Sequence, residues 1–252
     1  MSLRRLQVMA ADASMMEAFL AIFPVVNDRV SLELRRRADQ LHPNHRNPYI
    51  LSRLAASAAL SSALRFPIDF VGSRDDARHY GLMLSLAHED LVGAAVTWPI
   101  DAPFSLSIDV VDVGEVDRVT KRFPQFGARW MPNCKPTAMS SADILNIQET
   151  YGKLVDPVAL ILAQHWGLRE CCVKLVGITG RSFPFECFRG PVALFPPHFE
   201  AHVVDRGREE LRSVGLVPNL RVFVWPQVVQ VPGGEEKLYV VVVAACRREI
   251  LC

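Results

Sequence analysis

The chain has 252 residues, of which 50% are hydrophobic and 22% charged, so it can build a core and is not globally disordered. Its 28 basic and 27 acidic residues give a formal net charge of +1, which excludes a strong general field for nucleic acid or a membrane surface. The apolar block Leu238–Ala245 is too short for a membrane helix, which needs ~20 residues, and the N-terminus lacks the apolar core of a secretory signal. We therefore expect a monomeric cytoplasmic protein with reduced thiols, with organelle targeting left open.

The first half of the chain predicts two helices followed by strands. An arginine-rich pattern predicts a helix at Asp28–Ala38, and an Ala- and Leu-rich pattern predicts another at Tyr49–Leu64. Strands are expected at Ile68–Val71, Leu82–Leu86 and Leu91–Trp98, and Pro99–Pro103 is a natural seam.

The second half has a similar order, with one strand before its helices. A strand is expected at Ser105–Val113, and helices at Glu115–Phe123, Ser141–Tyr151 and Val155–Val176. The remainder, from Ser182 to Cys246, predicts strands alone: Phe185–Phe188, Phe199–Val204, Arg221–Val231 and Leu238–Ala245. The predicted fold is therefore α+β, a pseudo-dimer of two similar α/β halves, 1–103 and 104–252, each with a helix packed on a mainly antiparallel sheet.

The helix predicted at Val155–Val176 carries the first chemical candidates. Trp166, Glu170 and Lys174 are spaced four residues apart, which places them on one stripe of the helix. A carboxylate and an ammonium on one stripe can hold a metal ion and a phosphate side by side. The alternative is a surface salt bridge between Glu170 and Lys174, worth ~0.3–0.5 kcal/mol.

Asp109 is the second candidate, because it interrupts an otherwise apolar strand. An aspartate there is costly unless it is paired or bound to a cation, and it shares a strand face with Ser107 and Val111. The alternative is that Asp109 caps the helix that follows. His88, between two apolar strands, could bind an anion from the turn or could simply be solvated.

Taken in chain order, the three segments resemble the phosphopantetheinyl transferases of the surfactin-synthetase-activating (Sfp) type. The family's S-x-S-H turn matches Ser85–His88, its G-[IV]-D-[IV]-E strand matches Ser107–Val111, and its W-x-x-K-E-x-x-x-K helix matches Trp166–Lys174. An upstream segment resembling G-R-L-x-x-R is present at Ser52–Ser57. The overall arrangement resembles the broad-specificity eukaryotic members.

The resemblance implies an Mg²⁺-dependent holo-[acyl-carrier-protein] synthase. Such an enzyme moves 4′-phosphopantetheine from coenzyme A to a serine of an acyl or peptidyl carrier protein domain and releases adenosine 3′,5′-bisphosphate. The implied roles are Mg²⁺ binding by Asp109 and Glu170, proton acceptance by Glu170, contact with the transferred phosphate by Lys174, and binding of the 3′-phosphate by His88 with Arg46 or Arg53. The implied partners are coenzyme A and the carrier domain.

The chain departs from the family pattern at several positions. Val111 stands where a second acid is usual, so a water would complete the metal's ligand shell. Arg169 stands where the family has lysine, Ala87 replaces a serine, and a clean G-K-P segment is missing, for which Arg74 or Arg78 is a poor substitute.

These departures leave two alternatives open. One is a non-catalytic relative that binds a carrier or partner protein, and the other is a metal-dependent nucleotide hydrolase that uses the same acids. The loop after Phe123, with Trp130 and Met131, offers an apolar docking surface for a carrier, although these side chains could equally belong to the core.

Overall fold

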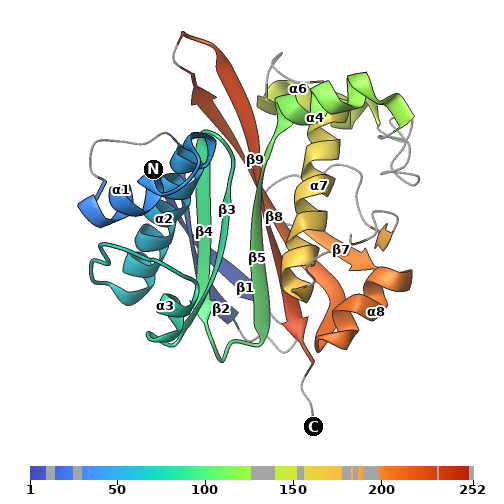
Figure 1. The fold of residues 1–252 in the computed structure, drawn as a ribbon. Helices are drawn as coiled ribbons and strands as arrows, with labels where there is room; N and C mark the ends of the chain where they lie inside the picture. Colours follow the sequence, from blue (N-terminus) through green and yellow to red (C-terminus); the bar gives the residue numbers. More distant parts are fainter. Residues whose placement is uncertain are drawn as a thin grey trace. The chain divides into compact units, whose positions relative to one another are not determined.

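The computed structural model describes residues 1–9, 15–24, 30–125, 140–151, 156–177, 183, 187–189, 199–231 and 233–249. The chain forms two compact units, Met1–Val110 and Val111–Cys252 (Figure 1). Helices and strands are mixed, and the two sheets are mainly antiparallel, which confirms the α+β prediction at this level. None of the described helices is long and apolar enough to cross a membrane.

The first unit contains a four-stranded antiparallel sheet in the order β1-β2-β4-β3. Its strands are β1 (Ser2–Met9), β2 (Met15–Pro24), β3 (Leu82–His88) and β4 (Val92–Pro99). Its helices are α1 (Leu32–Asp39), α2 (Pro43–Leu64) and α3 (Asp75–Arg78).

Two predictions for this unit were wrong. The expected strand at Ile68–Val71 is irregular backbone, and two strands that were not predicted, β1 and β2, complete the sheet. Strand β2 is buried on both faces along Leu20–Ile22, so it lacks the polar alternation that identifies a half-exposed strand. Helix α2 also begins earlier than expected, because His42 caps it by accepting the N–H of Asn44 at 3.4 Å.

Small residues let α2 lie directly on its sheet. Its buried alanines, Ala55, Ala56 and Ala59, share a core with residues of β2 and β4. At Gly93 the strand backbone meets the helix backbone, so that an added Cβ would lie 2.5 Å from the carbonyl oxygen of Leu51. The helix cannot occupy its observed position if residue 93 carries a side chain.

The second unit contains a sheet in the order β5-β9-β8-β7-β6, in which the described pairs β6–β7, β7–β8 and β8–β9 are antiparallel. Its strands are β5 (Phe104–Asp112, which spans the boundary between the units), β6 (Phe188–Arg189), β7 (Phe199–Val203), β8 (Leu216–Gln230) and β9 (Glu236–Arg248). Its helices are α4 (Val113–Arg122), α6 (Ser141–Tyr151), α7 (Pro157–Val176) and α8 (Asp205–Ser213).

Helix α8 contradicts the prediction that the C-terminal region forms strands alone. Its sequence is strongly charged, and only Gly207 and Leu211 are buried, one turn apart, as in a surface helix. The burial of so few apolar residues explains why hydrophobic periodicity did not reveal it.

Helix α7 forms the centre of the second core. Its Gly167 lies against β9, where an added Cβ would lie 2.7 Å from Cγ2 of Val242. Four buried cysteines belong to the same core: Cys171, Cys172, Cys187 and Cys246. Burial raises the pKa of Cys172 well above its usual range and that of Cys246 to about 12, so these thiols are protonated at neutral pH.

We expect Gly93→Ala to lower the free energy of unfolding by about 3 kcal/mol, because the added methyl group collides with the α2 backbone and cannot be relieved by a rotamer change. Urea denaturation would measure the loss. Gly114→Ala, within α4, is the matched control, since its Cβ would meet only a side-chain oxygen of Asp112, at 3.2 Å. Equal stability of both variants would contradict the close approach.

Candidate functional site

The predicted stripe on α7 is the part of this helix where polar side chains reach the surface. Most of α7 is buried, but Trp166, Glu170 and Lys174 are half-buried and follow one another at one-turn intervals. Their apolar neighbours fix the rotation of the helix, because Leu168 and Cys171 belong to the core. The stripe therefore presents a carboxylate and an ammonium at the edge of the core.

Glu170 is not part of the surface salt bridge that the spacing allowed. Its Oε1 accepts a hydrogen bond from Nη1 of Arg169, its neighbour in sequence, rather than from Lys174. The side chain of Glu170 is 29% exposed and that of Arg169 is 11% exposed. The carboxylate therefore lies nearer the protein surface than the guanidinium. One oxygen of the carboxylate is thus fixed, while the group stays accessible to solvent.

Asp109 lies in β5 and is half-buried, and it does not cap the following helix. That task belongs to Asp112, whose Oδ1 accepts the N–H groups of Gly114 at 2.8 Å and Glu115 at 3.2 Å. The structural alternative for Asp109, that it serves as a helix cap, is therefore wrong.

A buried hydroxyl ties the strand of Asp109 to the strand of His88. Ser85 Oγ of β3 accepts the N–H of Ile108, at 3.2 Å, and both residues are buried. His88 is the last residue of β3, is exposed, and lies opposite Gly93 of β4. His88 therefore ends the strand β3. The serine of the same strand, Ser85, binds the backbone of Ile108, which is the residue before Asp109.

Arg46 and Arg53 lie on one stripe of α2, seven residues or about 10 Å apart along the axis. The guanidinium of Arg46 is hydrogen-bonded to the backbone at the end of α1. Its Nε donates to the carbonyl oxygen of Leu41 and its Nη2 to that of Asp39, each at 3.2 Å. Arg53 lies over the Tyr49 ring at 4.8 Å, and its buried Nε has no hydrogen-bond partner in the described part of the chain. Of the two, Arg53 is better able to donate to a phosphate.

Val111 belongs to the core of the second unit. It is 4% exposed, and its Cγ2 lies 3.2 Å from the position of a Cβ added at Gly167. A carboxylate at residue 111 would have to replace this contact with α7. The strand face that carries Asp109 is therefore apolar at the position where the resemblance would place a second acid.

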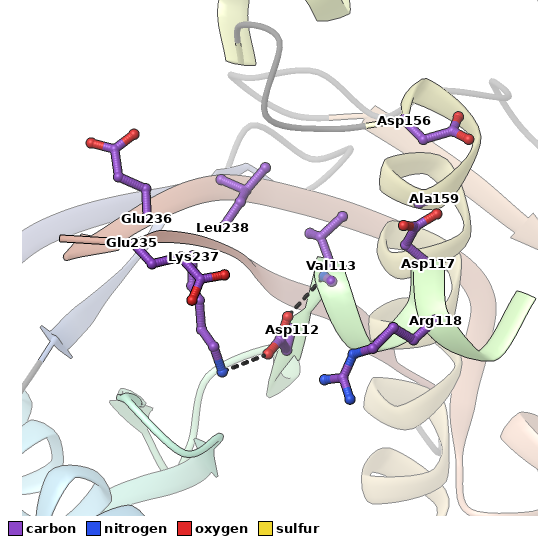
Figure 2. Close-up of a pocket in the computed structure, with 11 residues that line it drawn as sticks. Asp112, Val113, Asp117, Arg118, Asp156, Ala159, Glu235, Glu236, Lys237 and Leu238 are labelled. Atoms are coloured by element: carbon purple, nitrogen blue, oxygen red, sulfur yellow. Dashed lines mark hydrogen bonds and ion pairs between the residues drawn. The ribbon is translucent and has the colours of Figure 1, made fainter. Parts of the chain in front are cut away.

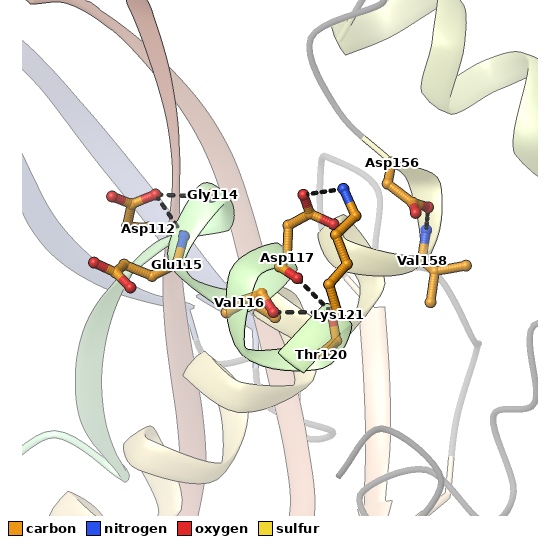
Figure 3. A network of polar contacts seen from close by, with 9 residues as sticks. All are labelled: Asp112, Gly114, Glu115, Val116, Asp117, Thr120, Lys121, Asp156 and Val158. Atoms are coloured by element: carbon orange, nitrogen blue, oxygen red, sulfur yellow. Dashed lines mark hydrogen bonds and ion pairs between the residues drawn. The ribbon is translucent and has the colours of Figure 1, made fainter. Parts of the chain in front are cut away.

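A separate cavity of about 350 Å³ lies in the second unit, at the start of α4 and α7 (Figure 2). Asp112 projects into it from the end of β5 and pairs with Lys237 of β9 at 3.4 Å, and Asp156 caps α7 nearby (Figure 3). Glu170 lies fourteen residues after Asp156, ~21 Å along the helix, and no predicted site residue lines this cavity. Its polar side chains are largely engaged in helix capping and ion pairs.

Asp109 and Glu170 suit a hard cation as donors. Mg²⁺ commonly takes one or two protein carboxylates and completes its shell with water and substrate phosphates. Both carboxylates are half-buried, and neither is used as a helix cap. Among the described residues, no group of three His, Cys, Asp or Glu side chains converges on one point.

The apolar docking surface predicted on the loop after Phe123 cannot be placed, because Trp130 and Met131 lie outside the described residues.

We expect Val111→Glu to destabilise the protein rather than to strengthen Mg²⁺ binding. A carboxylate introduced against Gly167 would be buried without a partner, which costs about 3–5 kcal/mol. Thermal unfolding and Mg²⁺ titration of the same variant separate the two effects. Val228→Glu, at a residue that is 44% exposed, is the control and should unfold like the wild type. Tighter Mg²⁺ binding at unchanged stability would show that residue 111 faces the ion.

Comparison of the sequence with protein-family models and with curated proteins found no match.

Proposed function

We propose that this protein transfers 4′-phosphopantetheine from coenzyme A to a serine of an acyl or peptidyl carrier domain. The observation that carries the proposal is the contact between β5 and α7. Val111 shares a strand face with Asp109, and it packs on Gly167, three residues before Glu170. Along their own elements, Asp109 comes two residues before this contact and Glu170 three residues after it.

The chemistry of this transfer needs charge placement more than covalent help. The serine hydroxyl attacks the phosphorus that bears the pantetheine chain, and the diphosphate P–O bond to the nucleotide breaks. Glu170 accepts the serine proton, and its half-buried carboxylate, with one oxygen held by Arg169, is suited to this role. Lys174, one turn later on the same stripe, stabilises the charge on the transferred phosphoryl group.

Asp109 and Glu170 would hold Mg²⁺, which supplies neutralisation of the diphosphate charge when bound. On the first unit, His88 and Arg53 would hold the 3′-phosphate of coenzyme A. His88 is exposed at a strand end, and Arg53 contributes its guanidinium, which lies over the Tyr49 ring. The fold proposed with this function is the pseudo-dimer of two similar halves. Each unit does contain a helix lying on its own sheet, α2 at Gly93 and α7 at Gly167.

The proposal predicts that Glu170→Gln abolishes transfer while the protein stays folded. Loss of a proton acceptor and metal ligand should lower kcat by about 10²–10⁴-fold, because amide and carboxylate have the same shape but not the same charge. Incubation with coenzyme A, Mg²⁺ and an apo carrier domain, followed by mass spectrometry of the carrier, measures the product.

Glu209→Gln, an exposed acid on α8, is the matched control and should transfer at the wild-type rate. Near-normal turnover by folded Glu170→Gln would contradict the assignment. A wild-type protein that binds the carrier without modifying it would favour a non-catalytic relative, and nucleotide release without a carrier would favour a hydrolase.

A second prediction concerns His88. We expect His88→Ala to raise the KM for coenzyme A about tenfold and to leave the KM for dephospho-coenzyme A unchanged. A hydrogen bond to a charged phosphate contributes ~1.5–3 kcal/mol, and the analogue has no 3′-phosphate to lose. Steady-state kinetics with both substrates tests this. His79→Ala, at an exposed histidine after α3, is the control, and equal effects on both substrates would exclude the phosphate role.

A further inference from the structure

Arg169 is a buried charge on α7, with 9% of the residue exposed. Its Nε donates to the carbonyl oxygen of Phe183 at 2.7 Å, and its Nη1 donates to Oε1 of Glu170. Its guanidinium carbon also lies 5.6 Å from the centroid of the Trp166 ring. One side chain thus connects Glu170 to a backbone segment that follows α7.

Burial of this cation is tolerated because its donors are engaged by a carbonyl and a carboxylate. The guanidinium is planar, and its N–H groups point in fixed directions. The bond to Phe183 therefore fixes the plane of the group, and that plane fixes the direction from which Nη1 meets Glu170. A lysine ammonium, on a flexible stem, would not transmit such an orientation.

We propose that Arg169 is a positioning residue, which holds the Glu170 carboxylate in the orientation needed to accept a proton and to bind Mg²⁺. This inference rests on the proposed transferase function. The family that the chain resembles has lysine at this position, but here the arginine is directed inward, to Phe183 and Glu170. Contact with the substrate phosphate is then the task of Lys174, and Arg169 acts through Glu170.

Arg169→Met and Arg169→Lys test the role in the carrier assay. Arg169→Met should lower kcat about 10–100-fold and raise the Mg²⁺ concentration for half-maximal rate by a similar factor, as is usual when a partner of a metal ligand is removed. The KM for coenzyme A should change by less than about twofold, because Arg169 does not touch the substrate. Arg169→Lys should fall between, since it keeps the charge but makes only one of the two contacts.

Arg206→Met is the control, because Arg206 pairs with Glu210 on α8 at 3.6 Å and is 63% exposed. It should match the wild type in every measurement. A raised KM for coenzyme A at unchanged Mg²⁺ dependence in Arg169→Met would overturn the proposal and assign Arg169 to the substrate.

A double-mutant cycle on thermal unfolding, without substrate, provides a readout that does not depend on activity. Arg169→Met and Glu170→Gln should be non-additive, because each removes one charge of the same ion pair. If Arg169→Met does not fold, the cycle is measured with Arg169→Lys. Additive effects would overturn the pairing. A wild type that is inactive toward carriers would remove the proposed function alone, since the cycle still tests whether Arg169 holds Glu170.

Discussion

In each unit, one helix packs directly on a sheet at a glycine, and this close packing sets the position of the candidate site residues that the helix carries. Gly93 lets the backbone of α2 rest on β4, and Gly167 lets α7 rest on β9 and β5. A side chain at either position would push the helix outward, because protein cores are close-packed and cannot absorb the extra volume. The same helices carry the candidate side chains, Arg53 on α2 and Glu170 on α7. The two glycines therefore determine both the packing of these helices and the positions of their candidate site residues.

Elements with a clear period could be predicted from the sequence, and the others could not. Helix α7 and strands β3 and β4 matched their patterns within a few residues, since each combines a regular spacing with obvious end signals. Strand β2 is buried on both faces along Leu20–Ile22 and shows no alternation there. Helix α8 buries only Gly207 and Leu211, which leaves almost no hydrophobic signal. In both cases the missing information lies in the tertiary neighbours.

The candidate site shows the same division. Spacing alone was sufficient to place Trp166, Glu170 and Lys174 on one stripe, because a helix repeats every 3.6 residues. Spacing could not tell which of Asp109 and Asp112 caps α4, since that depends on where the strand ends. Nor could it show that the cation beside Glu170 turns inward, because the acceptor on Phe183 lies fourteen residues away along the chain. Roles that depend on contacts distant in sequence need the fold.

The buried cysteines offer a way to measure how often the core of the second unit opens. An alkylating reagent attacks thiolates that solvent can reach, and Cys171, Cys172 and Cys246 are enclosed by α7, β8 and β9. Burial also keeps Cys172 and Cys246 in the unreactive protonated form. The rate of modification at neutral pH is therefore set by how often the core separates, as in hydrogen exchange, and not by the thiols themselves. The frequency of these openings can be read in the native protein without a denaturant, from the time course of cysteine labelling.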